Sequence, residues 1–317
     1  MSAQSRVLCL GEALIDAVHR DGDTTEIVGG SLLNVAAGLA ALGHDSHIAS
    51  YWGRDDRGAR LDEFCAERGI SVVEGTRGAS HTTVAHAEIN EAGHATYTFD
   101  LDWDVPALPD LGDFAHLHTG SYAAALGAGG EKVLAAAREA SRTGTVSYDP
   151  NIRPAVMGSP DDVRGRVGDL IACADIVKAS DEDIAWLYPT RDVEEVMREW
   201  LKAGVGMVVA TCGPRGALIA LAGARDLLSV APLDVPVADT VGAGDSFMAG
   251  LISGLLDAGL GGSVEAKDRL RAATWDTVLP AIHRATLTSG ITVSKHGAFA
   301  PTREAITEEA TRWPLFC

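Results

Sequence analysis

Positive charge is scarce in this sequence. Its 26 Lys and Arg residues stand against 44 Asp and Glu residues, which leaves a formal net charge of −18 at pH 7. So acidic a chain repels nucleic acid and anionic membranes over long range, and we expect neither as a partner. An anionic ligand must therefore be held locally, by oriented backbone N–H groups, by a few placed cations or by Mg²⁺.

Cysteine is also limited, and long apolar runs are missing. The cysteines form no Cys-x-x-Cys pair, which argues against a disulfide framework and against a zinc site. The first residues lack the apolar centre of a signal peptide, and no run of about 18 apolar residues occurs. These absences predict a cytoplasmic location. The cysteines are Cys9, Cys65, Cys173, Cys212 and Cys317.

Two common nucleotide-binding motifs are absent as well. No Gly-Lys pair occurs in the chain, which excludes a Walker A loop. The glycines near position 242 do not continue as a dinucleotide fingerprint, because Phe247 stands where the third glycine is required. No such fingerprint follows the first predicted strand either, so a dinucleotide-dependent oxidoreductase is not expected.

What the sequence does contain is an alternation of short β-rich runs and longer helical patterns, typical of a mostly parallel sheet covered by helices. Two segments, at about 13–29 and 82–104, break this rhythm with strand-like pieces around predicted turns at 21–23 and 90–93. Neither is apolar enough on both faces for a central parallel strand. We predict one α/β domain over 1–317, with these two segments forming a small separate sheet. The predicted strands are 6–10, 47–51, 146–149, 176–178 and 207–211, and the predicted helices are 31–42, 60–68, 131–141, 161–174, 193–203, 244–255 and 272–287.

The most informative stretch is Asp-Thr-Val-Gly-Ala-Gly-Asp-Ser-Phe at 239–247, which leads into a helical segment. Its small residues leave the N–H groups of Gly242, Ala243 and Gly244 unobstructed at a helix start, where N–H donors and the helix dipole attract anions. Asp245 has the wrong charge to bind phosphate. It can instead take a proton from a hydroxyl that attacks phosphate. The loop favours phosphoryl transfer, and a plain helix cap is the alternative.

With this loop in place, the chain resembles the ribokinase (PfkB) family of sugar kinases over nearly its full length. The resemblance implies a doubly wound α/β fold with a small β-sheet lid. It also implies transfer of the ATP γ-phosphoryl group to a sugar hydroxyl, with Mg²⁺. The matching motifs, in family order, are Gly-Glu-Ala-Leu-Ile-Asp at 11–16, Gly-Gly-Ser-Leu-Leu-Asn-Val-Ala at 29–36 with Gly-Arg-Asp-Asp-Arg-Gly at 53–58, Ser-Tyr-Asp-Pro-Asn-Ile-Arg-Pro at 147–154, Thr-Cys-Gly-Pro-Arg-Gly-Ala at 211–217, residues 239–245 and Lys-His-Gly-Ala at 295–298.

On the sugar side, Asp16 follows the first strand, and its carboxylate could accept hydrogen bonds from two hydroxyl groups of one sugar. The alternative is that Asp16 is a solvated acid on a strand of the lid. Gly29 and Gly30 would let the backbone approach the sugar closely. Asn34, near the start of a helix, would hydrogen-bond to the sugar; the alternative is an amide on the helix surface.

The mid-chain loop carries a third group of candidates. Asp149, Asn151 and Arg153 alternate, which predicts that all three lie on one side of an extended loop. Arg153 would hold a phosphate, a substrate carboxylate or Asp149 itself.

On the nucleotide side, the resemblance implies that Thr211, Gly213 and Gly216 approach the ATP phosphates and ribose, although Gly216 fits a turn-only role equally well. Lys178 would reach a phosphate or act structurally. Ser180 and Asp183 replace the family's Asn and Glu, and Asp183 would act on Mg²⁺ through water. Asp239 matches the acid beside which some members of the family bind K⁺.

Two other features are predicted to be structural. His116 and His118 share one face of a strand and lack Cys or acidic partners, so we expect packing and no metal. Trp103 is expected in the core, with contact to a sugar or a partner lid as the alternative.

The expected function is an ATP-dependent sugar kinase, most simply a fructokinase, because 11–16 and 149–153 resemble that branch. 2-Keto-3-deoxygluconate kinase is the second candidate activity and ribokinase the third, and a nucleoside kinase is less favoured. A non-catalytic sugar or nucleotide sensor on the same fold is the alternative from another class. A homodimer through the lid is compatible with the resemblance.

Overall fold

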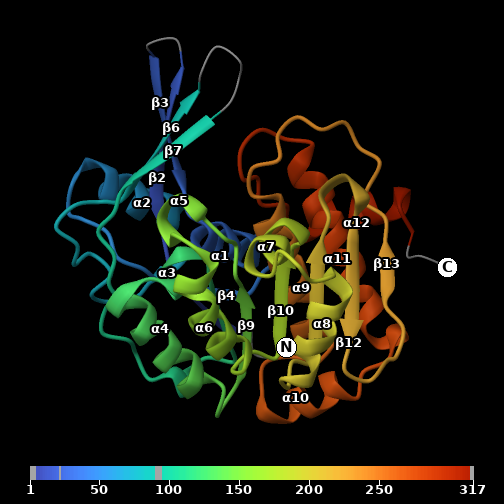
Figure 1. Ribbon diagram of the computed structural model, residues 1–317. Helices are drawn as coiled ribbons and strands as arrows, with labels where there is room; N and C mark the ends of the chain where they lie inside the picture. Colours follow the sequence, from blue (N-terminus) through green and yellow to red (C-terminus); the bar gives the residue numbers. More distant parts are fainter. Residues whose placement is uncertain (1–4, 21–22, 90–94, 315–317) are drawn as a thin grey trace.

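The computed structural model describes residues 5–20, 23–89 and 95–314 (Figure 1). The predicted turns at 21–23 and 90–93 therefore lie largely outside the described residues. No described helix combines the length and the apolar character that crossing a membrane requires.

The described strands and helices follow the predicted alternation. The strands are β1 (Arg6–Leu10), β2 (Leu14–Arg20), β3 (Asp23–Gly29), β4 (Asp45–Ala49), β5 (Ser71–Val72), β6 (Val84–Ile89), β7 (Ala95–Asp100), β8 (His116–Gly120), β9 (Thr145–Asp149), β10 (Ile176–Ser180), β11 (Met207–Thr211), β12 (Ala217–Leu221) and β13 (Leu228–Val230). The helices are α1 (Ser31–Ala41), α2 (Asp56–Glu67), α3 (Ser121–Ala125), α4 (Gly127–Ala140), α5 (Pro154–Met157), α6 (Pro160–Ile171), α7 (Asp181–Leu187), α8 (Val193–Lys202), α9 (Ala243–Asp257), α10 (Val264–Arg271), α11 (Trp275–Val293) and α12 (Arg303–Arg312), with short 3₁₀ turns η1 (Leu111–Asp113) and η2 (Gly213–Arg215).

The main sheet has the strand order β13-β12-β11-β10-β9-β8-β1-β4-β5 in the described residues. All neighbouring strands from β11 to β5 run parallel, and only β12 and β13 are antiparallel at one edge. The order reverses direction after β1, because β4 lies on one side of it and β8 on the other. Ligands bind outside the carboxyl ends of the strands at such a reversal. The fold class predicted from the sequence, a doubly wound and mostly parallel sheet, is confirmed.

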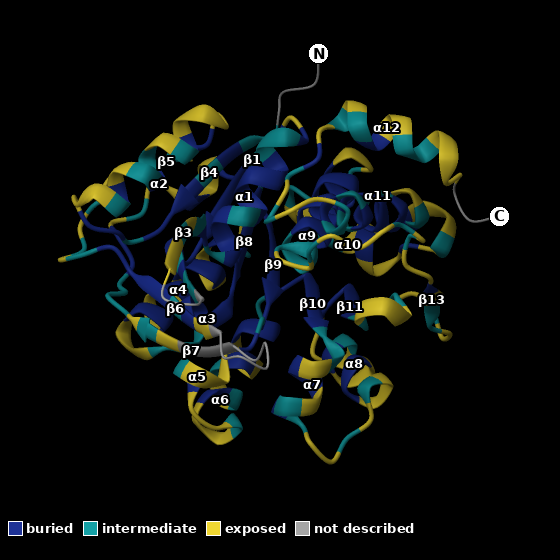
Figure 2. Cartoon of the chain, turned by 90° about the horizontal axis from the view of Figure 1, so that it is seen from above, coloured by how far each residue is buried: buried dark blue, intermediate teal, exposed yellow. Residues whose placement is uncertain are grey.

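Helices cover both faces of this sheet. Alternate residues of β1 enter different cores, because successive side chains of a strand point to opposite faces. Leu8 and Leu10 pack with α4, α6 and α8, whereas Val7 and Cys9 pack with α1, α9 and α11. Figure 2 shows the buried strands between layers whose outer surfaces are exposed.

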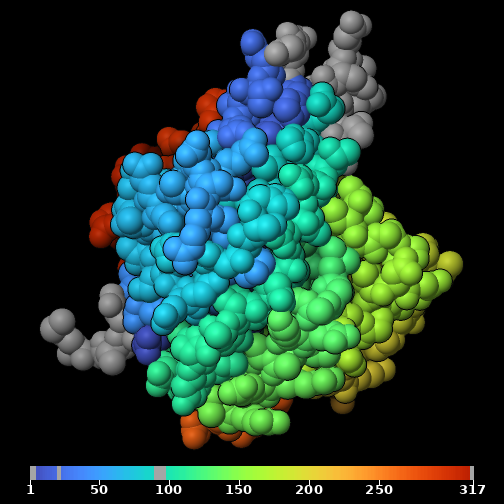
Figure 3. All heavy atoms as spheres, turned by 90° about the vertical axis from the view of Figure 1, so that its left-hand side faces the viewer, coloured from blue at the N-terminus to red at the C-terminus, as the bar shows by residue number. Residues whose placement is uncertain are grey.

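A second sheet, with the order β3-β2-β6-β7, stands apart from the main one. β2 and β6 pair in parallel, and β3 and β7 flank them antiparallel. Figures 1 and 3 show this small sheet projecting beyond the body of the molecule. It comprises the two segments that broke the α/β rhythm of the sequence, so the prediction of a separate small sheet is confirmed.

The small sheet is anchored to α2 by the motif at 53–58. The Asp55 carboxylate accepts hydrogen bonds from the N–H groups of Gly58 and Thr82 and from the Thr82 hydroxyl, so it caps α2 and fixes the entry to β6. Glu26 of β3 accepts hydrogen bonds from Arg57 and Arg60. The segment 53–58 and Arg60 therefore hold the small sheet against the body.

Several boundaries differ from the predicted ones for local reasons. α2 begins at Asp56 and not at 60, because Asp55 is its N-cap. β4 covers Asp45–Ala49 and not 47–51, because its register against β1 pairs Arg6 with Asp45 and Leu10 with Ala49. The last long helix runs to Val293, well past 287, and tolerates Pro280 inside it.

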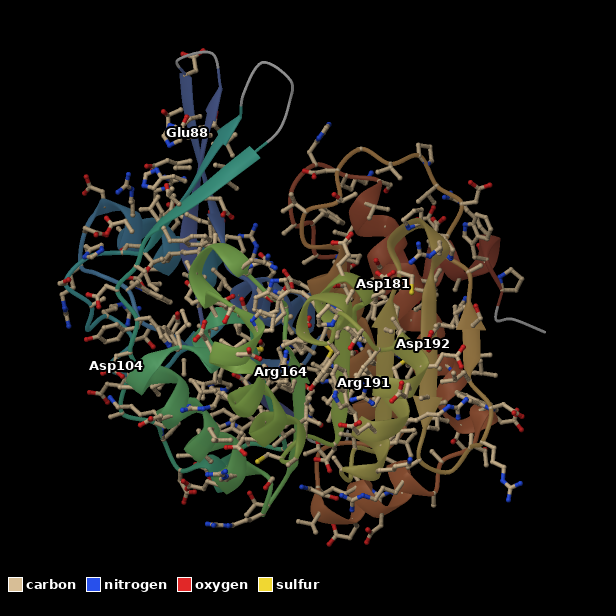
Figure 4. All side chains as sticks on the ribbon, viewed as in Figure 1. Glu88, Asp104, Arg164, Asp181, Arg191 and Asp192 are labelled. Carbon is tan, nitrogen blue, oxygen red and sulfur yellow. The ribbon has the colours of Figure 1, made fainter. Side chains whose placement is uncertain are left out.

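Some of the scarce cations have structural roles on the surface. The guanidinium carbons of Arg164 and Arg191 lie 5.7 and 5.6 Å from the centre of the Tyr188 ring. Arg191 also pairs with Glu195 and Glu199 of α8. Figure 4 shows Arg164 and Arg191 close together across the elements α6 to α8, where they tie these helices to one another.

Candidate functional site

The residues singled out by sequence meet along one edge of the main sheet. Parallel strands present their carboxyl ends on the same side, so the segments that follow β1, β8, β9, β10 and β11 are neighbours there. Helix α9 begins at this edge and packs against α1 and α11. The site is therefore assembled from segments between residues 11 and 298.

Asp245 lies in the first turn of α9, and α1 holds its carboxylate. The Ser31 hydroxyl donates to Oδ1 at 2.7 Å, and the Asn34 side-chain amide donates to Oδ2 at 2.9 Å. Asn34 was predicted to bind the sugar; in the structure its amide is used on Asp245. Ser31, which is buried, was not identified from the sequence, and only its place three residues before Asn34 could have indicated it.

The loop before Asp245 forms the predicted helix start. Gly242 is the N-cap of α9 with φ of 72°, a left-handed conformation that favours glycine. A Cβ there would lie 2.5 Å from the Ala298 Cβ, so the loop after α11 also requires glycine. The N–H of Ala243 donates to the Thr240 carbonyl at 3.3 Å. Among the three N–H groups that were predicted to be unobstructed, the N–H of Ala243 therefore makes one long hydrogen bond within the loop.

Asp239 ties this loop to the segment after α11. Its carboxylate accepts the N–H of Val241 at 3.0 Å and the N–H of Gly297 at 2.9 Å. Partial burial works to raise the pKa of Asp239, but the backbone donors outweigh it and the pKa is lowered. A fixed anion therefore stands beside the N-terminus of α9.

A buried ion pair lies behind the anion loop. Nζ of Lys178 is 2.5 Å from Oδ2 of Asp149, and the two side chains are 5% and 3% exposed. A Cβ at Gly244 would lie 3.0 Å from the same Nζ, so the ammonium group reaches the start of α9. Burial raises the pKa of Asp149 to about 6 against the pull of Lys178. For Lys178, the surrounding carboxylates outweigh burial and raise the pKa.

Asp16 and the two glycines at 29–30 pack against one another. A Cβ at Gly29 would lie 2.0 Å from Oδ2 of Asp16. Gly30 has φ of 110°, and a Cβ there would lie 2.7 Å from the Glu12 carbonyl oxygen. Burial raises the pKa of Asp16 to about 6, with Arg153 working to lower it and Asp245 to raise it. The glycines thus make room for a half-buried carboxyl that shares its surroundings with Asp245 and Arg153.

The expectation of one shared side for Asp149, Asn151 and Arg153 is wrong. Asn151 has φ of 39°, which turns the chain out of the extended conformation that alternation requires. Asp149 points inward to Lys178, whereas Arg153 is exposed and donates to the carbonyls of Asn151 and Ile152 at 3.4 and 3.1 Å. The expected alternative pairing of Arg153 with Asp149 is absent from the described ion pairs.

The nucleotide-side segment 211–216 forms a tight turn between β11 and β12. Gly213 and Gly216 have φ of 54° and 87°. A Cβ at Gly216 would lie 1.9 Å from the Val230 carbonyl oxygen, so the turn itself demands this glycine. The Thr211 hydroxyl donates to the Ala179 carbonyl at 3.4 Å. Thr211 therefore stands next to Ser180, at the carboxyl ends of β11 and β10.

Ser180 and Asp183 form a capping box at the start of α7. The Ser180 hydroxyl accepts the N–H of Asp183, and Oδ2 of Asp183 accepts the N–H of Ser180 at 2.8 Å. Oδ1 of Asp183 accepts the N–H of Ile152 at 2.8 Å. Both carboxylate oxygens thus have backbone partners, which leaves their remaining lone pairs for a contact through water.

The other two predictions concern packing. His116 and His118 are buried and bond to Thr145 and Ser147 of β9, and burial lowers the pKa of both imidazoles. No metal-ligating cluster occurs among the residues that the structure describes. Trp103 donates from Nε1 to the Ala123 carbonyl at 3.0 Å and lies against Gly129. Both imidazoles thus pack within the main sheet, and the partly buried Trp103 packs against the core.

Comparison with known proteins gives a consistent result. The sequence profile described as pfkB family carbohydrate kinase matches residues 4–305. A fructokinase from Rhizobium leguminosarum bv. trifolii is 32% identical over 262 residues, 78% of this chain and 79% of that protein. A fructokinase from Klebsiella pneumoniae is 30% identical over 265 residues, 80% of this chain and 86% of that protein.

Solved structures resemble this fold over almost the whole chain. A fructokinase double mutant from Vibrio cholerae O395, in a form with bound fructose, ADP and potassium ion, has a TM-score of 0.78 at 25% identity. The match covers 96% of this chain and 98% of that one. A fructokinase with bound ATP from Xylella fastidiosa has a TM-score of 0.82 at 22% identity, with 97% and 98% covered.

Proposed function

The chain belongs to the pfkB family of carbohydrate kinases, and from that premise we propose that it transfers the γ-phosphoryl group of ATP to fructose. The observation that carries this is the carboxylate of Asp245, held by Ser31 and Asn34 at the N-terminus of α9. A positioned base beside an anion-binding helix start is what phosphoryl transfer to a hydroxyl needs.

The reaction follows from these positions. Asp245 accepts the proton of the sugar hydroxyl as the oxygen–phosphorus bond forms and the bond to ADP breaks. The backbone N–H groups of Gly242, Ala243 and Gly244 stabilise charge on the transferring group without reorganisation. Lys178 adds a positive charge from behind Gly244. The N–H groups lie at the start of α9, and Lys178 lies on β10 of the main sheet.

On the sugar side, Asp16 and the backbone at Gly29 and Gly30 bind hydroxyl groups of the substrate. The small sheet closes over the sugar as a lid and excludes water. Thr211, Gly213 and Gly216 approach the phosphates and ribose of ATP, beside Ser180. These roles are supported by the shared edge of the main sheet at which the residues lie.

The metal ions fit the available donors to different degrees. Mg²⁺ would arrive with the ATP phosphates and neutralise their charge, and Asp183 would contact it only through water, because both its oxygens bind N–H groups. Asp239 provides the fixed anion that a K⁺ site beside the anion loop requires.

A homodimer through the lid and a cytoplasmic location remain predictions.

2-Keto-3-deoxygluconate is a second candidate substrate, favoured by Arg153. Its exposed guanidinium bonds to backbone carbonyls and to no carboxylate among the described ion pairs, which leaves it able to clamp a substrate carboxylate. Ribose is a third candidate, supported only by the family.

A coupled ADP-release assay over hexoses, pentoses and keto-acids tests the proposal. We expect Mg²⁺-dependent release with fructose giving the highest kcat/KM. A higher value with 2-keto-3-deoxygluconate or ribose would correct the substrate. Silence across the panel, together with sugar or ATP binding by calorimetry, would favour the sensor on the same fold.

The clamp on Asp245 gives a separate prediction. Ser31→Ala and Asn34→Ala should each lower kcat by about 10-fold, because a hydrogen bond to a charged group contributes roughly 1.5 kcal/mol. KM for ATP should stay nearly constant, since neither residue is placed on the nucleotide. Ser141→Ala removes an exposed hydroxyl bond far from the site and serves as the control. An unchanged kcat in both variants would contradict the clamp.

A further inference from the structure

One cationic side chain stands on the nucleotide side of the site without a part in the proposed reaction. Arg215 ends the 3₁₀ turn η2 between β11 and β12, and it is the only Lys or Arg in the segments 180–183 and 211–216. Its side chain is 72% exposed. In a chain with a net charge of −18, an exposed cation beside a site proposed for an anionic nucleotide is an available donor.

Arg215 is held at one corner by the first residue of α7. Its Nη2 donates to Oδ2 of Asp181, whose side chain is 23% exposed. Asp181 follows Ser180, the last residue of β10, so this contact joins the carboxyl ends of β10 and β11. Figure 4 shows Asp181 at the upper edge of the main sheet. The guanidinium therefore lies at the edge where the other site residues meet.

The backbone beneath Arg215 is fixed by the turn itself. The N–H of Arg215 donates to the Cys212 carbonyl at 3.1 Å, and the N–H of Cys212 donates to the Gly216 carbonyl at 2.7 Å. Burial raises the pKa of the Cys212 thiol, Asp181 raises it further and Arg215 lowers it, so both charged groups lie close to this turn. The Arg215 side chain thus starts from a rigid base.

Negative charge surrounds this arginine. Asp181, Glu182 and Asp183 all occupy the first turn of α7, and together they repel an incoming phosphate. A cation that contacts an acid and a phosphate at once removes this repulsion. A guanidinium has five N–H donors in a fixed fork, so a contact through Nη2 alone leaves donors for a second anion.

The strand order indicates which phosphates are within reach. Lys178 of β10 reaches the start of α9, where the γ-phosphoryl group is proposed to be transferred. The turn η2 follows β11, which is the next strand and lies farther from α9's partner strand β1 in the sheet order. Arg215 is therefore placed beside the part of the nucleotide that leaves as ADP.

We propose that Arg215, anchored by Asp181, binds the α- and β-phosphates of the nucleotide and so sets the affinity for ATP and ADP. This rests on the proposed function, which brings the turn at 211–216 to the nucleotide. Asp181 is a positioning residue that holds one corner of the guanidinium, while the remaining N–H groups donate to phosphate oxygens.

Arg215→Gln tests the contact by calorimetry with ADP and Mg²⁺ in the absence of sugar. The Kd for ADP should rise about 10-fold, the effect of losing a hydrogen bond between charged groups, and adenosine should bind both proteins equally. In steady-state assays KM for ATP should rise by the same factor. The kcat should not fall, and KM for the sugar should stay constant, because Arg215 contacts neither the transferring group nor the sugar.

Arg138→Gln is the matched control. Arg138 near the end of α4 pairs with Asp169 near the end of α6, and both side chains are more than half exposed. This change also removes one surface cation from an ion pair, and it should leave the Kd for ADP unaltered. An equal loss of ADP affinity in both variants would reduce the effect to net charge and overturn the contact.

Asp181→Asn separates an anchored arginine from an independent one. We expect ADP to bind about 3-fold more weakly in the otherwise unaltered protein and no further change when Asp181→Asn is added to Arg215→Gln. Tighter ADP binding by Asp181→Asn would show that Asp181 competes with phosphate and would overturn the anchor.

The ADP measurements also keep this inference separate from the proposed function. An unchanged Kd for ADP in Arg215→Gln would overturn the phosphate contact, whatever sugar is phosphorylated. Absence of any sugar phosphorylation, with the 10-fold loss of ADP affinity still observed, would instead overturn the proposed function and support the contact. Unfolding curves without ligand show whether each variant is folded, which is expected because Arg215 is exposed.

Discussion

Asp245→Asn should lower kcat by about 10³-fold, within the range that general-base catalysis supplies. Asparagine keeps the shape of the side chain, and it can still accept from Asn34 while its amide donates to the Ser31 hydroxyl. It cannot take up a proton. We therefore expect sugar and ATP to bind almost normally, as measured by calorimetry, while steady-state ADP release nearly stops.

The matched control is Asp276→Asn. Asp276 is an exposed acid in the first turn of α11, as Asp245 is in the first turn of α9, so both changes remove one charge from a helix start. The control should leave kcat unchanged. Turnover by Asp245→Asn within a few-fold of the unaltered protein would rule out Asp245 as the base and leave it as a helix cap.

Lys178→Met should have the second large effect. It leaves Asp149 buried without a counter-charge, which typically costs about 3–5 kcal/mol in the free energy of unfolding. The pKa of Asp149 is already raised to about 6 by burial, and losing Lys178 raises it further. Because the folded state then binds a proton more tightly than the unfolded one, the loss should be largest near pH 8 and shrink toward pH 5. Urea unfolding at both values measures this.

The double variant Lys178→Met with Asp149→Asn separates structure from chemistry. With both charges gone, much of the free energy of unfolding should return, because no unpaired ion remains buried. The kcat/KM for ATP should stay at least about 100-fold low, since the charge behind Gly244 is missing. A stable double variant with normal kcat/KM would show that Lys178 acts only in the ion pair.

Several site features could be read from local patterns. The loop before Asp245 needs small residues at consecutive positions, and the structure gives Gly242 a left-handed φ of 72°. Strand periodicity placed β1 and β11 at their observed bounds. These predictions succeed because backbone conformation and the buried face of an element depend on residues a few positions apart.

Other predictions failed or missed residues because they depended on distant neighbours. Ser31 and Asp245 are 214 positions apart, and Asn34 and Asp245 are 211 apart. Nothing local to α1 says that its first turn meets α9. The alternation predicted at 149–153 fails because Asn151 has φ of 39° and because Asp149 points inward to Lys178, which comes from a different strand.

The sequence by itself therefore determined the mostly parallel fold, the small second sheet, the glycine loop at 242–244 and the acid that follows it. The tertiary structure decided which side chains hold that acid and where Lys178 places its charge. The division has a physical reason. Local patterns specify backbone conformation and burial, whereas the protonation and direction of a side chain depend on the groups that strand order brings beside it.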